Sequence, residues 1–256
     1  MTATVAARPA PPSHAKRNLA IVGVVAVVAL AAATVDLDPS EILELPGGIA
    51  LVFSRMFLEG GPDWSYLPTA MEGMLESLQI AWIGTVIGAF ISLPLGFFGA
   101  KNVSSTLASN VMRQVLNAIR AFPEVVLAIA IMIPLAGLGP VAGALAIGLH
   151  SVGTLGKLTA EVVEGIDPGP VEAARAAGGR PLQIQRWGVL PQVLPEIVAF
   201  WLYRFEINIR AAAILGVVGA GGIGFSLQQT LTFKRFELAA TAIIVVVVAT
   251  IAVDVV

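Results

Sequence analysis

The chain has 256 residues, of which 57% are hydrophobic and only 12% are charged. Soluble domains carry about 25% charged residues, so this chain has too little charge to cover a water-facing surface, and its composition indicates a membrane protein. A net charge of −2 excludes a general basic field that would bind nucleic acid. The absence of cysteine excludes disulfides, thiolate chemistry and cysteine-based zinc sites.

The first apolar run, Leu19–Val35, predicts a membrane-spanning helix, which needs roughly 20 apolar residues. It follows a basic stretch rich in proline and alanine over residues 1–18, which we expect to be a disordered cytoplasmic tail. A cleaved signal peptide is the alternative, but the long basic stretch and the lack of an A-x-A site favour an uncleaved helix. The following acidic residues complete an N-terminal region over 19–71. Within it, Glu41–Leu58 is expected to form a helix in the membrane interface.

Residues 72–256 contain five further apolar runs, so six spans are expected in all. The expected fold class is an all-α membrane protein. The expected spans are Leu75–Phe98, broken near its end by Pro94, then Glu124–Leu138, Gly139–Leu158, Ile197–Val218 and Leu238–Val256. Nothing basic follows Asp254 to anchor the last run, which leaves open whether the natural chain continues past Val256.

The distribution of lysine and arginine predicts the orientation, because short cytoplasmic loops are enriched in both. The N-terminal stretch is basic, residues 36–72 are acidic, and basic residues follow the second and fourth spans. Both termini and those two loops are therefore expected on the cytoplasmic side. Lys234 and Arg235 oppose the rule.

The longest polar stretch between spans, residues 161–196, predicts two short helices joined by a hinge. Pro170 suits the first turn of the first helix, and Glu172 lies near its N terminus, where the helix dipole favours an anion. Gly178 and Gly179 are expected to end this helix. So short a helix with such small side chains has little core of its own and can lie in a groove of another protein. An ordinary connecting loop has the same composition.

The second helix of this stretch is expected to start at Pro181. Pro191 and Pro195 are expected to end it before the chain re-enters the membrane.

Glu172-Ala173-Ala174, followed after three residues by Gly178 and later by Leu190-Pro191, resembles the EAA loop of ABC importer permeases. In that family the EAA helix docks into the ATP-binding subunit and transmits its closure to the spans. The resemblance therefore implies that these six residues couple the chain to an ATPase. The chain departs from the usual pattern at Gly188, where the family has isoleucine, which implies the loss of one apolar contact.

The resemblance extends over about residues 72–256 and points to the permeases of phosphonate importers, the PhnE group. The segments that carry it are YRFEINIR at 203–210, VVGAGGIG at 217–224, Leu78-Gln79, Arg120–Glu124 and Gly137–Pro140. It implies a type I ABC importer (MetI-like) permease core at 72–256, with the EAA coupling loop at 161–196, in the bacterial cytoplasmic (inner) membrane. It also implies a homodimer with two ABC ATPase subunits and an extracytoplasmic substrate-binding protein.

The function implied by this resemblance is import of phosphonate or a related phosphorus oxyanion, such as phosphate or phosphite, by ATP-driven alternating access. ATP and Mg²⁺ would be bound by the partner ATPase, so no cofactor is expected in this chain, which is a transport subunit rather than an enzyme.

Two glycine-containing motifs are set aside. Gly219, Gly221 and Gly224 satisfy G-x-G-x-x-G, but a membrane helix rather than a strand precedes them, so a glycine-rich turn is expected. Gly156-Lys157 matches the Gly-Lys at the end of a phosphate-binding P-loop. Leu158 stands where that motif needs serine or threonine, so the motif is incomplete.

Ionisable residues within spans are candidates for the translocation pathway, since each central charge costs roughly 3 kcal/mol. Arg204, Glu206 and Arg210 lie in or near the fifth span, and the spacing of Glu206 and Arg210 favours a structural pair. We expect His150 to be hydrogen-bonded within the bundle, with lining of the pathway as a second role. The pairs Gly84/Gly88 and Gly139/Gly143 have the spacing of close helix packing.

Three alternatives remain at this stage. The first is an ABC importer permease for another small solute. An ion-coupled secondary transporter would need carboxylates in several spans and a repeated interrupted helix, which the sequence does not show. A membrane enzyme would need clustered acid–base or metal-binding residues, whereas His14 and His150 are far apart.

Overall fold

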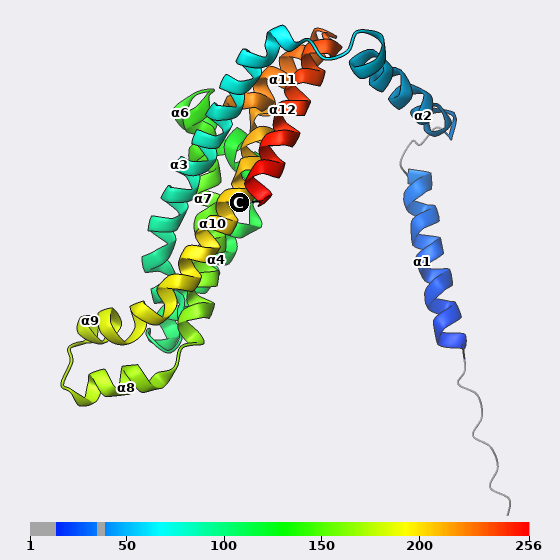
Figure 1. The fold of residues 1–256 in the computed structure, drawn as a ribbon. Coiled ribbons are helices and arrows are strands. Elements are labelled where there is room, and N and C mark those ends of the chain that lie inside the picture. The colour runs from blue at the N-terminus through cyan, green and yellow to red at the C-terminus, as the bar shows by residue number, and fades with distance from the viewer. Residues whose placement is uncertain (1–13, 35–38, 256) are drawn as a thin grey trace, which may run out of the picture. The chain divides into compact units, whose positions relative to one another are not determined.

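The computed structural model describes residues 14–34 and 39–255, and within these ranges the chain forms helices and no strand (Figure 1). The chain divides into two units, residues 1–53 and 54–256. The first unit contains α1 (Ala15–Thr34) and α2 (Pro39–Phe53). Helix α1 begins four residues before the expected start, and residues 1–13 of the expected tail lie outside the described ranges. The expected interfacial helix corresponds to α2 and, in the second unit, to the π-helical turn η1 (Ser54–Glu59).

The second unit is a helical bundle around three long helices, α3 (Leu67–Gly99), α7 (Pro140–Glu164) and α10 (Leu190–Leu215). Helices α3 and α7 make the most extensive contact, and both pack against α10 and α4. The remaining elements are η2 (Trp64–Tyr66), α4 (Thr106–Ala121), α5 (Glu124–Leu127), η3 (Ala128–Met132), α6 (Ile133–Ala136), α8 (Pro168–Ala176), α9 (Pro181–Ile184), η4 (Gln185–Val189), η5 (Gly216–Ala220), α11 (Gly222–Thr232) and α12 (Phe236–Val255).

Small residues explain the close approach of α3 and α7. A Cβ atom on Gly88 would lie 2.5 Å from Ser151 Cβ, and one on Gly84 would lie 2.7 Å from Ile147 Cγ2. The expectation of close packing at these two glycines is therefore confirmed. Gly139 has a different role, because it precedes α7 with φ 129° and a Cβ there would meet nothing within 4 Å.

Four helical segments are long and apolar enough to cross a membrane: α1, α3 with the turn before it, α7 and α12. Two bent pairs raise the number to six if each counts as one span. They are α4 with α5–α6, bent by 86°, and Pro181–Ala220 with α11, bent by 55°. The expected six spans correspond to this upper number.

The predicted third span is shorter than a full crossing. The helical run that starts at Glu124 ends at Ala136, whereas roughly 20 residues are needed. It follows α4, which was not expected to be helical, after a sharp bend at Phe122-Pro123. Pro123 explains the bend, because proline disfavours the helical conformation of the residue before it.

Two expectations about proline were wrong. Pro94 does not break α3, which continues to Gly99. Membrane helices tolerate an internal proline because neighbouring groups satisfy the freed carbonyl. Pro191 and Pro195 do not end the second loop helix, because α10 begins at Leu190 and runs through both. Pro191 lies in the first turn, where no intrahelical N–H bond is lost.

A glycine-rich turn separates α10 from α11, as the sequence indicated. Gly219, Gly221 and Gly222 all have positive φ angles. The freed N terminus of α11 is bound by α3: Gly222 N donates to Glu76 Oε2 at 2.8 Å, and Ile223 N donates to Ser77 Oγ at 3.0 Å. The fifth span begins before the expected Ile197, because α10 starts at Leu190. It is interrupted at the glycine-rich turn.

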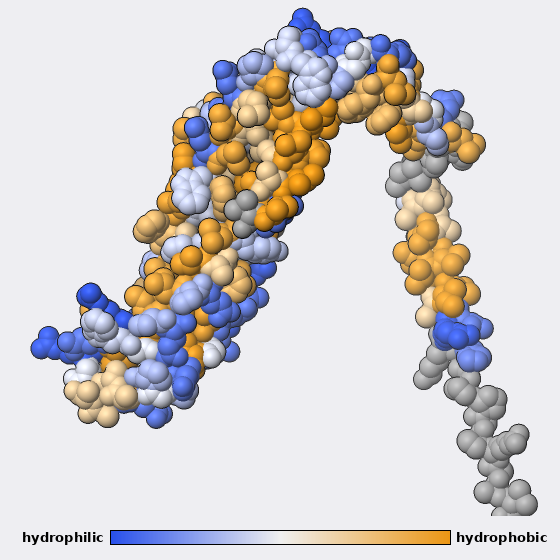
Figure 2. Space-filling model, in the orientation of Figure 1, coloured by the Kyte–Doolittle hydropathy of each residue, from blue (hydrophilic) through white to orange (hydrophobic). Residues whose placement is uncertain are grey.

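Helices α8 and α9 lie at one end of the bundle, beyond the ends of α7 and α10 (Figure 1). Hydrophilic side chains gather at this end, whereas hydrophobic side chains dominate the middle of the bundle (Figure 2). This distribution is typical of a bundle whose middle is surrounded by lipid and whose end is in water.

Candidate functional site

Helix α8, which carries the EAA-like residues, has defined caps at both ends. At its N terminus Asp167 accepts a hydrogen bond from Gly169 N at 2.9 Å. At its C terminus Gly178 has φ 79°, and its N–H donates to Arg175 O at 2.9 Å, while Gly179 N donates to Ala174 O at 3.0 Å. This is a Schellman motif, in which glycine adopts the left-handed conformation that other residues avoid. The predicted end of this helix at Gly178 and Gly179 is confirmed.

The side chains of α8 are available to a second protein. None of its residues is buried, and Glu172 and Ala173 are exposed while Ala174 is half-buried. Leu190 and Pro191 start α10, so they lie where the loop joins the bundle. Helix α8 therefore leaves most of its side chains exposed, while Val171 packs against the bundle.

Gly188 allows α8 to approach the bundle closely. It is buried, and a Cβ atom there would lie 3.2 Å from Val171 Cα and 3.3 Å from Pro170 O. The departure from the family pattern at this position therefore brings the backbones of α8 and η4 together, in place of an apolar side-chain contact.

Gln192 ties the start of α8 to α10. Its Oε1 accepts from Asp167 N at 3.1 Å, and its Nε2 donates to Asp167 O at 3.2 Å and to Gly188 O. These bonds join the residue that caps α8 to the first turn of the long helix α10. Gln192 therefore connects α8 directly to α10.

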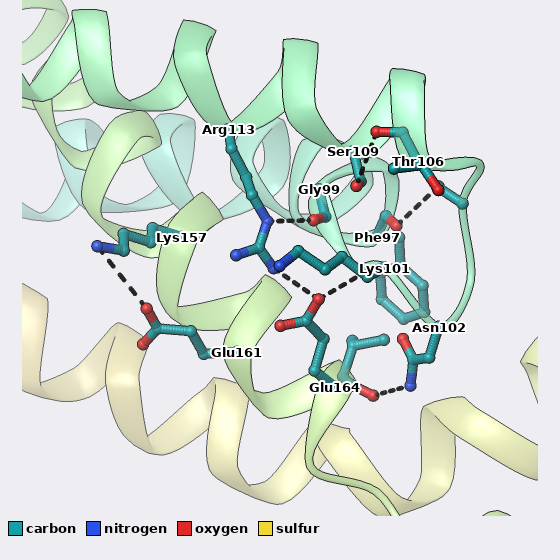
Figure 3. A network of polar contacts seen from close by, with 12 residues as sticks. Phe97, Gly99, Lys101, Asn102, Thr106, Ser109, Arg113, Lys157, Glu161 and Glu164 are labelled. Atoms are coloured by element: carbon teal, nitrogen blue, oxygen red, sulfur yellow. Dashed lines mark hydrogen bonds and ion pairs between the residues drawn. The ribbon is translucent and has the colours of Figure 1, made fainter.

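Glu164, the last residue of α7, ties the other end of the loop to α3 and α4 (Figure 3). Glu164 Oε1 lies 2.6 Å from Arg113 Nη2 and accepts from Lys101 N at 2.7 Å. Arg113 Nε in turn donates to Gly99 O at 2.9 Å, and Asn102 Nδ2 donates to Val163 O at 2.6 Å. The loop between α7 and α10 is thus fixed to the bundle on both sides.

A cleft of 490 Å³ lies between α8 and these anchoring residues. Glu172 and Arg175 line it from α8, Glu164 and Asn102 from the bundle. The cleft shows that α8 stands away from the bundle over part of its length.

Arg210 is held between two carboxylates on α10 and α12. Its Nη2 donates to Glu206 Oε1 at 2.7 Å, and its Nη1 donates to Asp254 Oδ1 at 3.3 Å. The sequence-based expectation of a pair between Glu206 and Arg210 is confirmed. The three groups carry a formal charge of −1 together, which does not favour an anion.

Arg204 and His150 belong to a separate polar cluster near the midpoints of α7 and α10. Arg204 Nη2 lies 3.7 Å from Glu124 Oε2, and His150 Nε2 lies 3.6 Å from the same oxygen. His150 Nδ1 is 3.1 Å from Phe122 O. A carbonyl only accepts hydrogen bonds, so Nδ1 carries the proton. The expectation that His150 is hydrogen-bonded within the bundle is confirmed.

The core of this cluster contains polar residues that the sequence analysis did not select. Arg204 Nε donates to Ser151 Oγ at 3.1 Å. Asn208 Nδ2 donates to Ser151 Oγ at 3.1 Å and to Thr85 Oγ1 at 2.8 Å. Polar residues at helical spacing within apolar spans were the available signal, since such residues bond between helices. Glu124 was missed as a site residue although it lies in a segment that carries the family resemblance.

In the described part of the chain, no three His, Cys, Asp or Glu side chains are grouped so that they could hold a metal ion. Lys157, the lysine of the incomplete P-loop, lies within α7, 3.8 Å from Glu161 Oε1. The candidate functional site consists of the exposed helix α8 and the buried polar cluster around Arg204.

Comparison with known proteins identifies the family. Residues 92–256 match the family described as binding-protein-dependent transport system inner membrane component. The chain is 41% identical over 186 residues to the phosphite transport system permease protein PtxC of Stutzerimonas stutzeri, covering 72% of this chain and 67% of that protein. It is 40% identical over 180 residues to the phosphate-import permease protein PhnE of Mycolicibacterium smegmatis, covering 70% of this chain but only 34% of that protein.

The fold is also found among solved structures. A chain of the MetNI methionine ABC transporter in an inward-facing conformation superposes with a TM-score of 0.65 at 20% identity, covering 75% of this chain and 94% of that chain. The expected type I, MetI-like fold is therefore confirmed. From the family match and the shared fold together, the chain belongs to the binding-protein-dependent transport system inner membrane component family and is an ABC transporter permease subunit, a membrane transport component rather than an enzyme.

Proposed function

We propose that this chain is the permease of an ABC importer that admits phosphorus oxyanions, with phosphite, phosphate and phosphonate as the substrate class. The observation that carries the substrate class is the 41% identity to a phosphite permease over most of the chain. The phosphate permease, with 40% identity, supports the same class.

The proposed assembly contains two copies of this chain, two ATPase subunits and an extracytoplasmic substrate-binding protein. Helix α8 supports the ATPase contact, since Glu172 and Ala173 are exposed at the end of the bundle and the helix buries little surface within the chain. In this arrangement α8, with Ala174 and Gly178, is the coupling helix. Leu190 and Pro191 connect its movement to α10. The N terminus lies in the cytoplasm, as the lysine and arginine distribution predicts.

The proposed mechanism is alternating access. Closure of the ATPase dimer on ATP displaces α8, and the bonds of Gln192 and Glu164 carry this displacement to α10, α3 and α4. The bundle then opens outward, receives the anion from the binding protein and returns after hydrolysis. ATP and Mg²⁺ are bound by the ATPase subunit.

The function is tested by reconstituting the chain with its partner ATPase and binding protein, in proteoliposomes that contain ATP. We expect uptake of phosphite that requires ATP and binding protein, with no uptake of methionine under the same conditions. Uptake that persists without ATP but follows an ion gradient would contradict the proposal. So would ATP-driven uptake of another solute with none of any phosphorus oxyanion.

A further inference from the structure

The polar cluster around Arg204 lies at a depth where a transported solute would pass. Thr85, Ser151 and Arg204 lie near the midpoints of α3, α7 and α10, respectively. The bend at Phe122-Pro123 lies beside them, since His150 bonds Phe122 O. Irregular backbone at membrane depth is tolerated only where protein buries it or where it lines a water-filled cavity. Phe122 is 52% exposed in this chain, so protein does not bury it here.

The cluster has hydrogen-bonding capacity that the described residues leave unused. The side chain of Arg204 is 9% exposed, and its Nη2 has no hydrogen-bond partner among the residues that the structure describes. Glu124 balances the charge of Arg204, but its Oε2 lies 3.7 Å from Arg204 Nη2, which exceeds hydrogen-bonding distance. His150 Nε2 is likewise 3.6 Å from that carboxylate. A buried guanidinium nitrogen without an acceptor is costly, so the geometry favours an acceptor that comes closer than Glu124 does.

The charge around the cluster is positive. Arg120 is exposed at the C-terminal end of α4. The aliphatic part of the Arg120 side chain packs against α7 at Gly153, where a Cβ atom would lie 2.7 Å from Arg120 Cγ. Two arginines and one glutamate give a formal charge of +1, before any protonation of His150. Arg210, by contrast, has both terminal nitrogens engaged by carboxylates.

From these observations we infer that Arg204, His150 and Arg120 form a binding site for the phosphorus oxyanion within the bundle, which Glu124 occupies when no anion is present. The inference rests on the proposed function and specifies where the anion binds. Arg204 Nη2 donates to an anion oxygen. His150 Nε2 accepts from a P–OH group of the monoanion, because Nδ1 holds the ring proton against Phe122 O. Arg120 supplies charge from the exposed side.

Glu124 gives this site a specific signature. Its carboxylate competes with the anion for Arg204, so the anion enters only as Glu124 moves aside. Removing the negative charge of Glu124 is therefore expected to strengthen anion binding, whereas removing the positive charge of Arg120 is expected to weaken it. A purely structural role for the cluster predicts no such opposition.

The test is direct binding of phosphite to the purified permease–ATPase complex without the binding protein, because binding protein would dominate the affinity of the complete system. The complex is kept in a detergent without phosphate groups, so that added phosphite is the only phosphorus oxyanion, and binding is followed by phosphorus NMR. The variants are Arg120→Gln and Glu124→Gln, with Arg235→Gln as a matched control on the turn before α12.

We expect the dissociation constant for phosphite to rise roughly threefold to tenfold in Arg120→Gln, as for loss of one charge near a partly exposed site. It should fall in Glu124→Gln and remain unchanged in Arg235→Gln. No saturable binding by the unmodified complex, equal affinities in all forms, or weaker binding in both cluster variants would overturn the inference. Because Arg120 is exposed, its variant should fold and decide the matter even if Glu124→Gln does not assemble. ATP-driven phosphite uptake with any of these negative results would leave the proposed function intact and remove only this site.

Discussion

The side-chain amide of Gln192 binds both backbone groups of Asp167, with Oε1 3.1 Å from the N–H nitrogen and Nε2 3.2 Å from the carbonyl oxygen. Asp167 caps α8, and Gln192 lies in the first turn of α10. This double hydrogen bond connects the proposed ATPase contact to a long helix of the bundle.

We expect Gln192→Leu to uncouple transport from ATP hydrolysis. Leucine retains much of the volume but removes three hydrogen bonds, each of which contributes about 1 kcal/mol. The complex should assemble and hydrolyse ATP while phosphite uptake per ATP falls severalfold. Gln114→Leu is the control, because Gln114 is exposed on α4. Unchanged uptake per ATP in Gln192→Leu would show that α8 acts on the bundle by another route.

Gly178→Val tests the hinge of the coupling helix. The φ of 79° places valine in the left-handed region, which costs about 1–2 kcal/mol and redirects the chain after α8. We expect poor recovery of the ATPase on co-purification, or ATP hydrolysis without uptake.

The control for this change is Gly165→Ala in the same loop. Gly165 has φ −86°, and a Cβ atom there would meet its nearest atom at 3.6 Å, so alanine fits. Full assembly and full uptake by Gly178→Val would contradict the role of α8.

Glu164→Gln tests the second anchor of the loop. The change removes the ion pair with Arg113 and weakens the bond from Lys101 N, which is expected to cost about 1 kcal/mol and to lower the melting temperature by about 2–4 °C. Uptake per ATP should fall as well. Glu161→Gln, one turn earlier, loses only an exposed pair with Lys157 at 3.8 Å, and its melting temperature should not change. Equal melting temperatures for the two variants would argue against this anchor.

Arg210→Gln tests whether this arginine serves the structure. Its removal leaves Glu206 and Asp254 without the cation between them, so we expect lower assembly or a lower melting temperature. The double change Glu206→Gln with Arg210→Gln removes one of the two carboxylates and should recover part of the loss, including uptake. Normal assembly of Arg210→Gln with a selective loss of phosphite binding would instead place Arg210 in the pathway.

The sequence predicted those features that depend on local chemistry. The hinge at Gly178 follows from the need for a positive φ after α8, and the pair of Glu206 and Arg210 follows from helical spacing. The packing of Gly84 and Gly88 follows from their spacing in an apolar helix.

Features that depend on tertiary contacts were missed. Pro94 was expected to break its helix, but the helices packed around α3 make an internal proline tolerable. Pro191 was expected to end a helix, but it lies in the first turn of α10, where proline loses no intrahelical hydrogen bond. Gln192 could not be selected, since its partner Asp167 is brought to it only when α8 folds back against η4. The cluster of Arg204 with Glu124 and Ser151 likewise joins residues far apart in the sequence.

The central claim, that α8 contacts an ATPase subunit, is tested most directly by cross-linking. The chain contains no cysteine, so Ala173→Cys introduces a single thiol on the exposed helix. Ser65→Cys provides a control thiol before α3, at the end of that helix away from α8. With a short thiol-to-amine cross-linker applied to the intact complex, we predict a covalent product of permease and ATPase from Ala173→Cys and none from Ser65→Cys. An intact complex that gives no product from Ala173→Cys, or equal product from both positions, would contradict the account.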